Sequence, residues 1–401
     1  MSEHQNPSRV VTAAILASSS LTVMANATIS PGLAGLEAHF SDVPNIRTLA
    51  GLVVTLPSLF VILFAGLFGW LADRFDRRHL LAIGMVIYAI GGVSGIFLSS
   101  IESILVGRAI LGVGVAGTMT LAITLAGDMW QGEARQRFLG LQASSMAAGG
   151  AIFMTIGGVL ASLDWRYPFL VYLFAIPIAI LVQIALAPVN TRPQGNADGS
   201  GNTQAREPFP WARLGPVYLA AVLFMVAFYL VPTRLPFLLS DLGVTSPSAV
   251  AMAMAGATLV SIPGSAFYGR LRRYLSGLGV FGLGFSLMGL GLLTISQSGG
   301  LAGALLGTLI MGSGMGTLMP NFSTFIMNRL PDSQRGRGSG LLTTSIFSGQ
   351  FLSPILSAPV GEVVGLQNVF IVFGGVVLLI GLCLAVAAMR APGPMQRPAE
   401  A

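Results

Sequence analysis

Five charged side chains are crowded into one stretch, GWLADRFDRRHLL, which covers residues 69–81. Both signs are present: Asp73, Asp76, Arg74, Arg77 and Arg78. The whole chain is only 9% charged and 54% hydrophobic. A charge beside apolar segments is costly unless it is paired or reaches water. The stretch therefore indicates either ion pairs that hold segments together or an anchor at a membrane surface that sets topology.

A second charge stands alone inside an apolar stretch, SILVGRAILGVGVAG. Arg108 is followed there by several glycines, of which Gly112 is the first. A charge within a membrane is expensive and indicates a functional site by default. The alternative is that Arg108, six residues from Glu102, extends its side chain to the membrane surface.

Polar side chains are few in the remaining apolar segments. Four amides are candidates to line a cavity: Asn26, Gln142, Asn321 and Gln350. Each could instead form a hydrogen bond between helices, which is the commoner role. No carboxylate stands clearly at the centre of a segment, so a cavity would suit apolar or weakly polar compounds better than polyvalent cations.

Enzyme motifs are absent from the sequence. There is no lysine, so no phosphate loop of the G-x-x-x-x-G-K-[ST] type exists. The histidines His4, His39 and His79 are too dispersed to ligate a metal. We predict no catalytic residue, no metal and no cofactor, and the lone cysteine, Cys383, is expected to be buried and inert.

Apolar segments of about 20 residues, the length of a membrane-spanning helix, recur along the chain. They are residues 11–35, 47–70, 80–99, 102–127, 136–161, 167–187, 214–239, 247–268, 276–297, 300–326, 337–362 and 367–389. Backbone groups in lipid must be satisfied within each segment, so each is expected to be a helix. The prediction is an all-α membrane protein with twelve transmembrane helices.

Arginine positions predict the orientation. With the N-terminus in the cytoplasm, 17 of the 21 basic residues fall in cytoplasmic segments, as the positive-inside rule expects. Both termini are then cytoplasmic. A Gly-, Pro- and Asn-rich interval, residues 188–213, reads as a cytoplasmic linker between halves 1–187 and 214–401. The stretch YGRLRRYL, residues 268–275, weakly repeats the charged stretch and indicates a duplicated six-helix unit.

The stretch GWLADRFDRRHL resembles the G-x-L-A-D-[RK]-x-G-[RK]-[RK]-x-L motif of the major facilitator superfamily. The matching positions are Gly69, Leu71, Ala72, Asp73, Arg74, Arg77, Arg78 and Leu80. Asp76 departs from the motif, because the family usually has glycine there. The resemblance implies a fold of two pseudo-symmetric six-helix bundles around a cavity.

The resemblance also implies roles for single residues. Asp73 would act in a gate that holds the two halves together, with Gly69 admitting a neighbouring helix. Asp128, at the cytoplasmic end of the fourth helix, is the expected partner of Arg77 or Arg74. Whether the motif does more than anchor a loop is left open by the sequence.

Two further stretches resemble the drug–proton antiporter branch of this family. Arg108 and Gly112 fit its R-x-x-x-G pattern, in which the arginine takes part in proton transfer; Glu37 or Asp128 is a candidate acid beside it. The fifth helix carries the Gly157-Gly158 pair of the antiporter motif but lacks the proline that precedes it. Plain glycine packing is the alternative there.

The expected function is secondary active transport, most simply proton-coupled efflux of small, largely apolar compounds, as in multidrug resistance antiporters. A transporter of a specific metabolite, such as a sugar or amino-acid derivative, is the alternative. A membrane sensor without transport activity is a third. We expect a monomer in the cytoplasmic (inner) membrane, with a small molecule, protons and lipid as partners and no nucleic acid.

Overall fold

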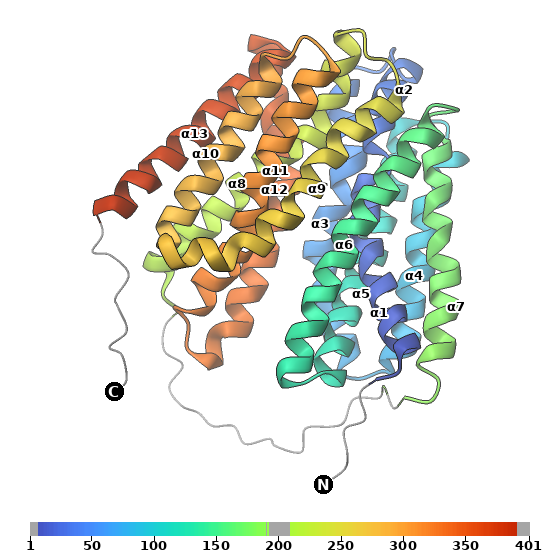
Figure 1. Cartoon of the computed structure of the whole chain (residues 1–401). Coiled ribbons are helices and arrows are strands. Elements are labelled where there is room, and N and C mark those ends of the chain that lie inside the picture. Colours follow the sequence, from blue (N-terminus) through green and yellow to red (C-terminus); the bar gives the residue numbers. More distant parts are fainter. Residues whose placement is uncertain (1–6, 190, 192–208, 391–401) are drawn as a thin grey trace. The chain divides into compact units, whose positions relative to one another are not determined.

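The computed structural model describes the chain except at the two ends and in the middle. The described residues are 7–189, 191 and 209–390. All regular secondary structure in this part of the chain is helical, which confirms the predicted fold class. Two compact units are formed, residues 1–212 and 213–401 (Figure 1). Most of the predicted linker, residues 190 and 192–208, lies outside the described residues.

The first unit begins with α1 and ends with α7. Its helices are α1 (Arg9–Ala27), α2 (Leu33–His39), α3 (Ile46–Ala72), α4 (Arg77–Val93), α5 (Ile101–Met129), α6 (Gly132–Ala161) and α7 (Ala175–Ala185). Short 3-10 segments stand at Ser30–Gly32, Ser94–Ile96 and Tyr167–Phe174. Within this unit α5 packs against α3 and α4, and α1 packs against α6.

The described part of the second unit contains six long helices. They are α8 (Trp211–Asp241), α9 (Pro247–Tyr274), α10 (Gly277–Ser296), α11 (Leu301–Met327), α12 (Asp332–Val364) and α13 (Leu366–Arg390). Here α11 packs against α9 and α10, and α10 packs against α13. The pairing of α11 with α9 and α10 repeats the pairing of α5 with α3 and α4.

The described helices agree with the predicted spans. Eleven helical segments of the described chain are long and apolar enough to cross a membrane, with α1 to α2 counted as one. The remaining predicted span corresponds to α12, which has 33 residues but an N-terminal half rich in Ser, Gly and Arg. The sixth span differs in detail, because it enters as a 3-10 helix with Pro168 in its first turn.

Glycines set the closest helix contacts of the first unit. A Cβ at Gly91 in α4 would collide with backbone atoms of Gly107, Ile110 and Leu111 in α5. On α5, a Cβ at Gly112 would stand 2.6 Å from the carbonyl oxygen of Pro57 in α3. Small residues let backbones touch in this way where lipid supplies no hydrophobic drive for association.

The same contacts recur 200 residues later. Gly91, Gly107, Gly112 and Gly114 in the first unit correspond to Gly291, Gly307, Gly312 and Gly314 in the second. A Cβ at Gly291 would stand 2.6 Å from both the Gly307 oxygen and the Met311 nitrogen. The weak repeat seen in the sequence is thus a repeat of the packing framework of α3–α5 in α9–α11.

These contacts give a direct test of the framework. Gly91→Val and Gly291→Val should each destabilise the protein by about 1–3 kcal/mol or prevent folding, because the new methyls meet rigid backbone. The measurement is the thermal unfolding temperature and monodispersity in detergent. Gly66→Val in α3, where nothing lies within 4 Å of the added carbon, is the matched control. Equal stability of Gly91→Val and Gly66→Val would contradict the framework.

Candidate functional site

Each arginine between the end of α3 and the first turn of α4 has its own partner. Arg77 forms an ion pair with Asp128 near the end of α5, and its Nε donates to the Ala72 oxygen at 3.1 Å. The Arg74 guanidinium lies 3.8 Å from the centre of the Trp70 ring. The loop is therefore tied to α5 by one salt bridge, and of the two arginines expected near Asp128, the structure places Arg77 there.

Arg78 connects the loop to α7. Its Nε donates to Oε1 of Gln183 at 2.6 Å, and Gln183 returns a hydrogen bond to the Arg78 oxygen at 3.4 Å. Asp73, which caps the C-terminal end of α3, is exposed within its unit. No atom lies within 4 Å of a Cβ placed at Gly69, so the close helix expected there is not present in the first unit.

Asp76 has a clear structural role. It caps the N-terminus of α4 by accepting a hydrogen bond from the Arg78 nitrogen at 2.9 Å. It also accepts one from the Thr191 hydroxyl at 2.5 Å, while the Arg77 nitrogen donates to the Thr191 oxygen. The backbone at Asp76 is extended, with φ −61°, so nothing here requires the glycine of the family motif.

The charge of Asp76 is stabilised in place. Partial burial raises the pKa of its carboxyl, but the hydrogen bonds from Thr191 and Arg78 and the nearby His79 outweigh burial, so the pKa lies below its usual value. A carboxylate at a helix N-terminus also benefits from the helix dipole. The start of the linker is thereby held against the α3–α4 loop.

Removing this carboxylate should loosen the loop. Asp76→Ala should cost about 1 kcal/mol of stability through the lost cap, whereas Asp76→Asn keeps a capping oxygen and should cost less. Folding lowers the pKa of the Asp76 carboxyl, so the ionised carboxylate stabilises the folded state at pH values above its unfolded pKa near 3.8. This stabilisation is lost as the pH falls through the folded pKa. Thermal unfolding of the three proteins at pH 7 and at about pH 3 measures this. No difference between Asp76→Ala and the native chain at pH 7 would contradict the assignment.

Arg108 lies completely buried in the first unit. It is the eighth residue of α5, about 10 Å along the helix axis from Ile101. Its side chain is 0% exposed, which excludes the alternative that it reaches the membrane surface. Its guanidinium carbon lies 4.9 Å from the Phe169 ring centre and 4.8 Å from that of Tyr172.

The guanidinium is held by the end of another helix. Nη2 of Arg108 donates to the Gly92 oxygen at 2.6 Å and to the Gly91 oxygen at 3.3 Å, both in the last turn of α4. A cation is favourable at a helix C-terminus. Nε and Nη1 are buried without a hydrogen-bond partner, and no described carboxylate pairs with Arg108.

Two tyrosines tie this site to α1. Tyr88 of α4 donates to the Leu21 oxygen at 2.8 Å, and Tyr172 donates to the Ala25 oxygen at 2.8 Å. A Cβ at Gly92 would collide with Tyr172, so glycine is needed there. These residues were not predicted from the sequence, although a tyrosine within an apolar span is a signal, because its hydroxyl needs a hydrogen-bond partner.

The acidic candidates lie away from Arg108. Glu37 in α2 accepts a 2.6 Å ion-pair hydrogen bond from Nε of Arg47 in α3, and Asp128 pairs with Arg77. The structure therefore brings neither of them to the buried arginine. The Gly157 backbone packs against Thr28, so helix packing accounts for that glycine.

The four cavity candidates are divided between the two units. Gln142 donates to the Ser19 hydroxyl at 2.7 Å, which joins α6 to α1. Asn321 donates to the Gly277 oxygen at 2.9 Å, which joins α11 to α10. Asn26 is partly exposed, and Gln350 is buried. Gln142 and Asn321 thus form the interhelical bonds that the sequence left as the alternative.

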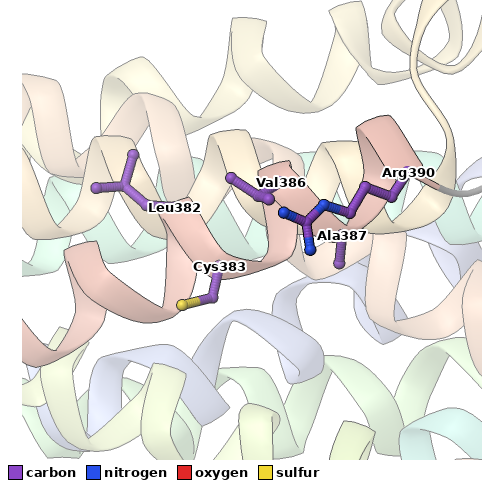
Figure 2. A pocket seen from close by; sticks show the side chains of 5 residues that line it. All are labelled: Leu382, Cys383, Val386, Ala387 and Arg390. Carbon is purple, nitrogen blue, oxygen red and sulfur yellow. The ribbon is translucent and has the colours of Figure 1, made fainter.

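The described surface has hollows on both units. One, shown in Figure 2, runs along α13 and is lined by Leu382, Cys383, Val386, Ala387 and Arg390. Cys383 is exposed there, so the expectation of a buried thiol is wrong, because its side chain points away from the packed face of α13. The other hollow lies between α1 and α6, beside the stacked rings of Trp130 and Phe138.

Long apolar helices, a repeated glycine framework and a buried cation define a polytopic helical membrane protein. The sequence profile of the Major Facilitator Superfamily matches residues 15–354 and 217–401. The chain belongs to this superfamily and is a multi-pass membrane protein with its fold.

Known relatives are distant. The chain is 28% identical over 159 residues to protein spinster of Drosophila melanogaster, which is 39% of this chain and 26% of the relative. It spans only 26–39% of the length of the four spinster relatives that it matches. Multidrug resistance protein 1 of Bacillus subtilis is 23% identical over 90% of both chains. The sialic acid transporter NanX of Escherichia coli is 24% identical over 77% of both.

The fold agrees with a solved structure as well. A bacterial homologue of the human lysosomal transporter Spinster, in an inward-facing and unoccupied conformation, superposes with a TM-score of 0.73. The sequence identity is 18%, over 96% of this chain and 98% of that one. At this identity the likeness concerns the fold alone.

Proposed function

We propose that the protein is a proton-coupled exporter of small, largely apolar compounds, a transporter and not an enzyme. The observation that carries this proposal is Arg108, a fully buried cation held by the C-terminal carbonyls of α4 without a carboxylate partner. An uncompensated charge inside a membrane bundle is stable only if the fold holds it there, and such residues mark ion or substrate paths. The full-length similarity to a multidrug resistance protein supports export.

Alternating access is the mechanism that this fold serves. The halves rock about a central site, so that it opens to one side of the membrane at a time. From the distribution of arginines we place the Arg77–Asp128 pair and the exposed Asp73 at the cytoplasmic side of the first half, with both termini in the cytoplasm and the protein in the cytoplasmic membrane. We assign Asp73 to the gate between the conformations and Arg77–Asp128 to the pair that keeps α4 aligned with α5.

In the coupling step, Arg108 acts as a fixed positive charge. A guanidinium is not deprotonated in proteins, so Arg108 does not carry the proton itself. It lowers the free-energy cost of burying a negative or partly negative group beside it. No described carboxylate lies beside Arg108, so we assign the proton to an acidic group that comes next to Arg108 in another conformation. Its protonation would remove its attraction to Arg108, and its deprotonation would restore that attraction, which couples proton movement to the change of conformation.

A transporter for an anionic metabolite is the second candidate. The same unpaired Nε and Nη1 of Arg108 would bind a carboxylate well. The similarity to a sialic acid transporter agrees with this alternative. The two candidates predict opposite responses to a proton gradient and different substrates.

Transport in proteoliposomes separates them. With an acidic interior, an antiporter should accumulate chloramphenicol, a neutral drug, and the accumulation should collapse when the gradient is dissipated. A symporter of anions should instead concentrate sialic acid when the exterior is acidic. Asp73→Asn should slow either flux by about tenfold while the protein stays folded in the membrane. Failure of all probes to move in response to either gradient would contradict proton coupling.

A further inference from the structure

The first span of the chain is broken before its end. α1 stops at Ala27, a 3-10 turn covers Ser30–Gly32, and α2 begins at Leu33. The break has a local cause, because Pro31 has no N–H to donate to the carbonyl oxygen of Ala27 four residues earlier. α2 is therefore a separate segment of seven residues, about 10 Å long.

The end of α1 is held by groups outside α2. Three consecutive carbonyl oxygens there accept hydrogen bonds from hydroxyl groups: Met24 from Thr28 at 2.9 Å, Ala25 from Tyr172 at 2.8 Å and Asn26 from Ser30 at 3.0 Å. The Thr28 backbone also lies against Gly157 of α6, where a Cβ would collide with it. These contacts leave Gly32, the residue before α2, as the point at which α2 can turn relative to α1.

α2 packs on the indole of Trp165, which follows α6. The ring centres of His39 and Phe40, at the end of α2, lie 4.9 and 5.5 Å from that of Trp165. A Cβ placed at Gly35 would stand 3.2 Å from the Cβ of Trp165. Because Gly35 has no side chain, α2 rests on Trp165 at this point without interlocking with it.

An ion pair also holds α2. Glu37 pairs with Arg47 in the first turn of α3, and their side chains are 22% and 39% exposed. An ion pair that is open to water contributes little to stability. Since α3 leads at its other end to the loop before Arg77, α2 lies at the end of the unit opposite the Arg77–Asp128 pair.

Trp165 connects α2 with the buried arginine. Its ring meets that of Phe169 edge to face, with 6.4 Å between the ring centres. The centre of the Phe169 ring in turn lies 4.9 Å from the guanidinium carbon of Arg108. α2 thus packs on the far end of a row of two rings that ends at Arg108.

We propose that α2 is a movable cover over the Arg108 site, which turns at Gly32 and closes on Trp165. Lifting α2 removes its packing on Trp165 and frees the row of Trp165 and Phe169 to shift, so that the guanidinium becomes accessible from this end of the unit. Leu36 of α2, which is 1% exposed, becomes accessible to water at the same time. The use of the cover in transport rests on the proposed function, whereas its opening can be measured without a substrate.

Cysteine labelling tests the opening. The native cysteine is removed by Cys383→Ser, and this background carries either Leu36→Cys or the control Ile104→Cys. Ile104 is 0% exposed and lies in the first turn of α5, at the same end of the unit. In detergent, we expect Leu36→Cys to react with a water-soluble maleimide about tenfold faster than Ile104→Cys, because the cover opens locally. Equal rates in two monodisperse proteins would overturn the proposal.

A disulfide tests whether the opening is needed for transport. The Cβ positions of Gly35 and Trp165 are close to the spacing found in disulfides, so Gly35→Cys/Trp165→Cys in the same background should fasten α2 when oxidised. We expect oxidation to slow the exchange of chloramphenicol in proteoliposomes by about tenfold and reduction to restore it. Ser20→Cys/Gly149→Cys is the control, because it joins α1 to α6 at Cβ positions 3.0 Å apart, and its exchange should not change on oxidation.

The two experiments fail in different ways. A cross-linked α2 that exchanges chloramphenicol as fast as its reduced form would overturn the proposal. If no form of the protein moves chloramphenicol, the proposed export is wrong, and the labelling rates alone decide whether α2 is a movable cover.

Discussion

The close contact between α4 and α5 is the constraint on which the first unit depends. Gly91 brings the last turn of α4 against α5, and the same turn offers its carbonyl oxygens to Arg108. Since no water satisfies polar groups in the bilayer core, a buried guanidinium needs acceptors from the protein itself. Gly91 allows both the close helix contact and the hydrogen bonds to Arg108. A side chain at this position would separate α4 from α5 and move the carbonyl oxygens out of reach of Arg108.

The repeat shows which parts of this arrangement are structural. Thr308 stands 200 residues after Arg108, and its hydroxyl bonds the Ala253 oxygen at 2.6 Å in an ordinary interhelical contact. Gly291 and Gly307 keep the contact between α10 and α11 without any buried cation beside them. The glycine framework therefore builds both halves, whereas Arg108 has no counterpart at the equivalent position. The second unit has a buried arginine elsewhere, Arg234 of α8, which donates to the Ser357 hydroxyl and the Pro354 oxygen of α12. Nε and Nη1 of Arg108 are buried without a hydrogen-bond partner, and this is the basis for proposing the coupling role in the first unit.

Much of the fold could be predicted from the sequence, since apolar length and arginine placement determine where membrane helices begin and end. Opposite charges at two helix ends on the same side predicted a pair between Asp128 and either Arg77 or Arg74, and the structure has Arg77. The roles of Asp76 and of the tyrosines could not be predicted, because Thr191 lies 115 residues from Asp76 and Leu21 lies 67 residues from Tyr88. Pairing across such separations depends on how helices pack, which local patterns do not contain. Likewise, Glu37 is an acidic residue near a span, and only the structure shows that Arg47 holds it away from Arg108.

The proposed coupling of protons to substrate depends on Arg108. The direct measurement compares gradient-driven accumulation with substrate-for-substrate exchange in liposomes containing Arg108→Gln, Arg108→Lys or the native chain. Exchange needs only alternating access, so it should persist in Arg108→Gln, whereas accumulation of substrate against its gradient should be lost. Arg108→Lys keeps a positive charge and should recover part of the accumulation. An Arg108→Gln protein that accumulates substrate to the native level, with the same dependence on the pH gradient, would contradict the account.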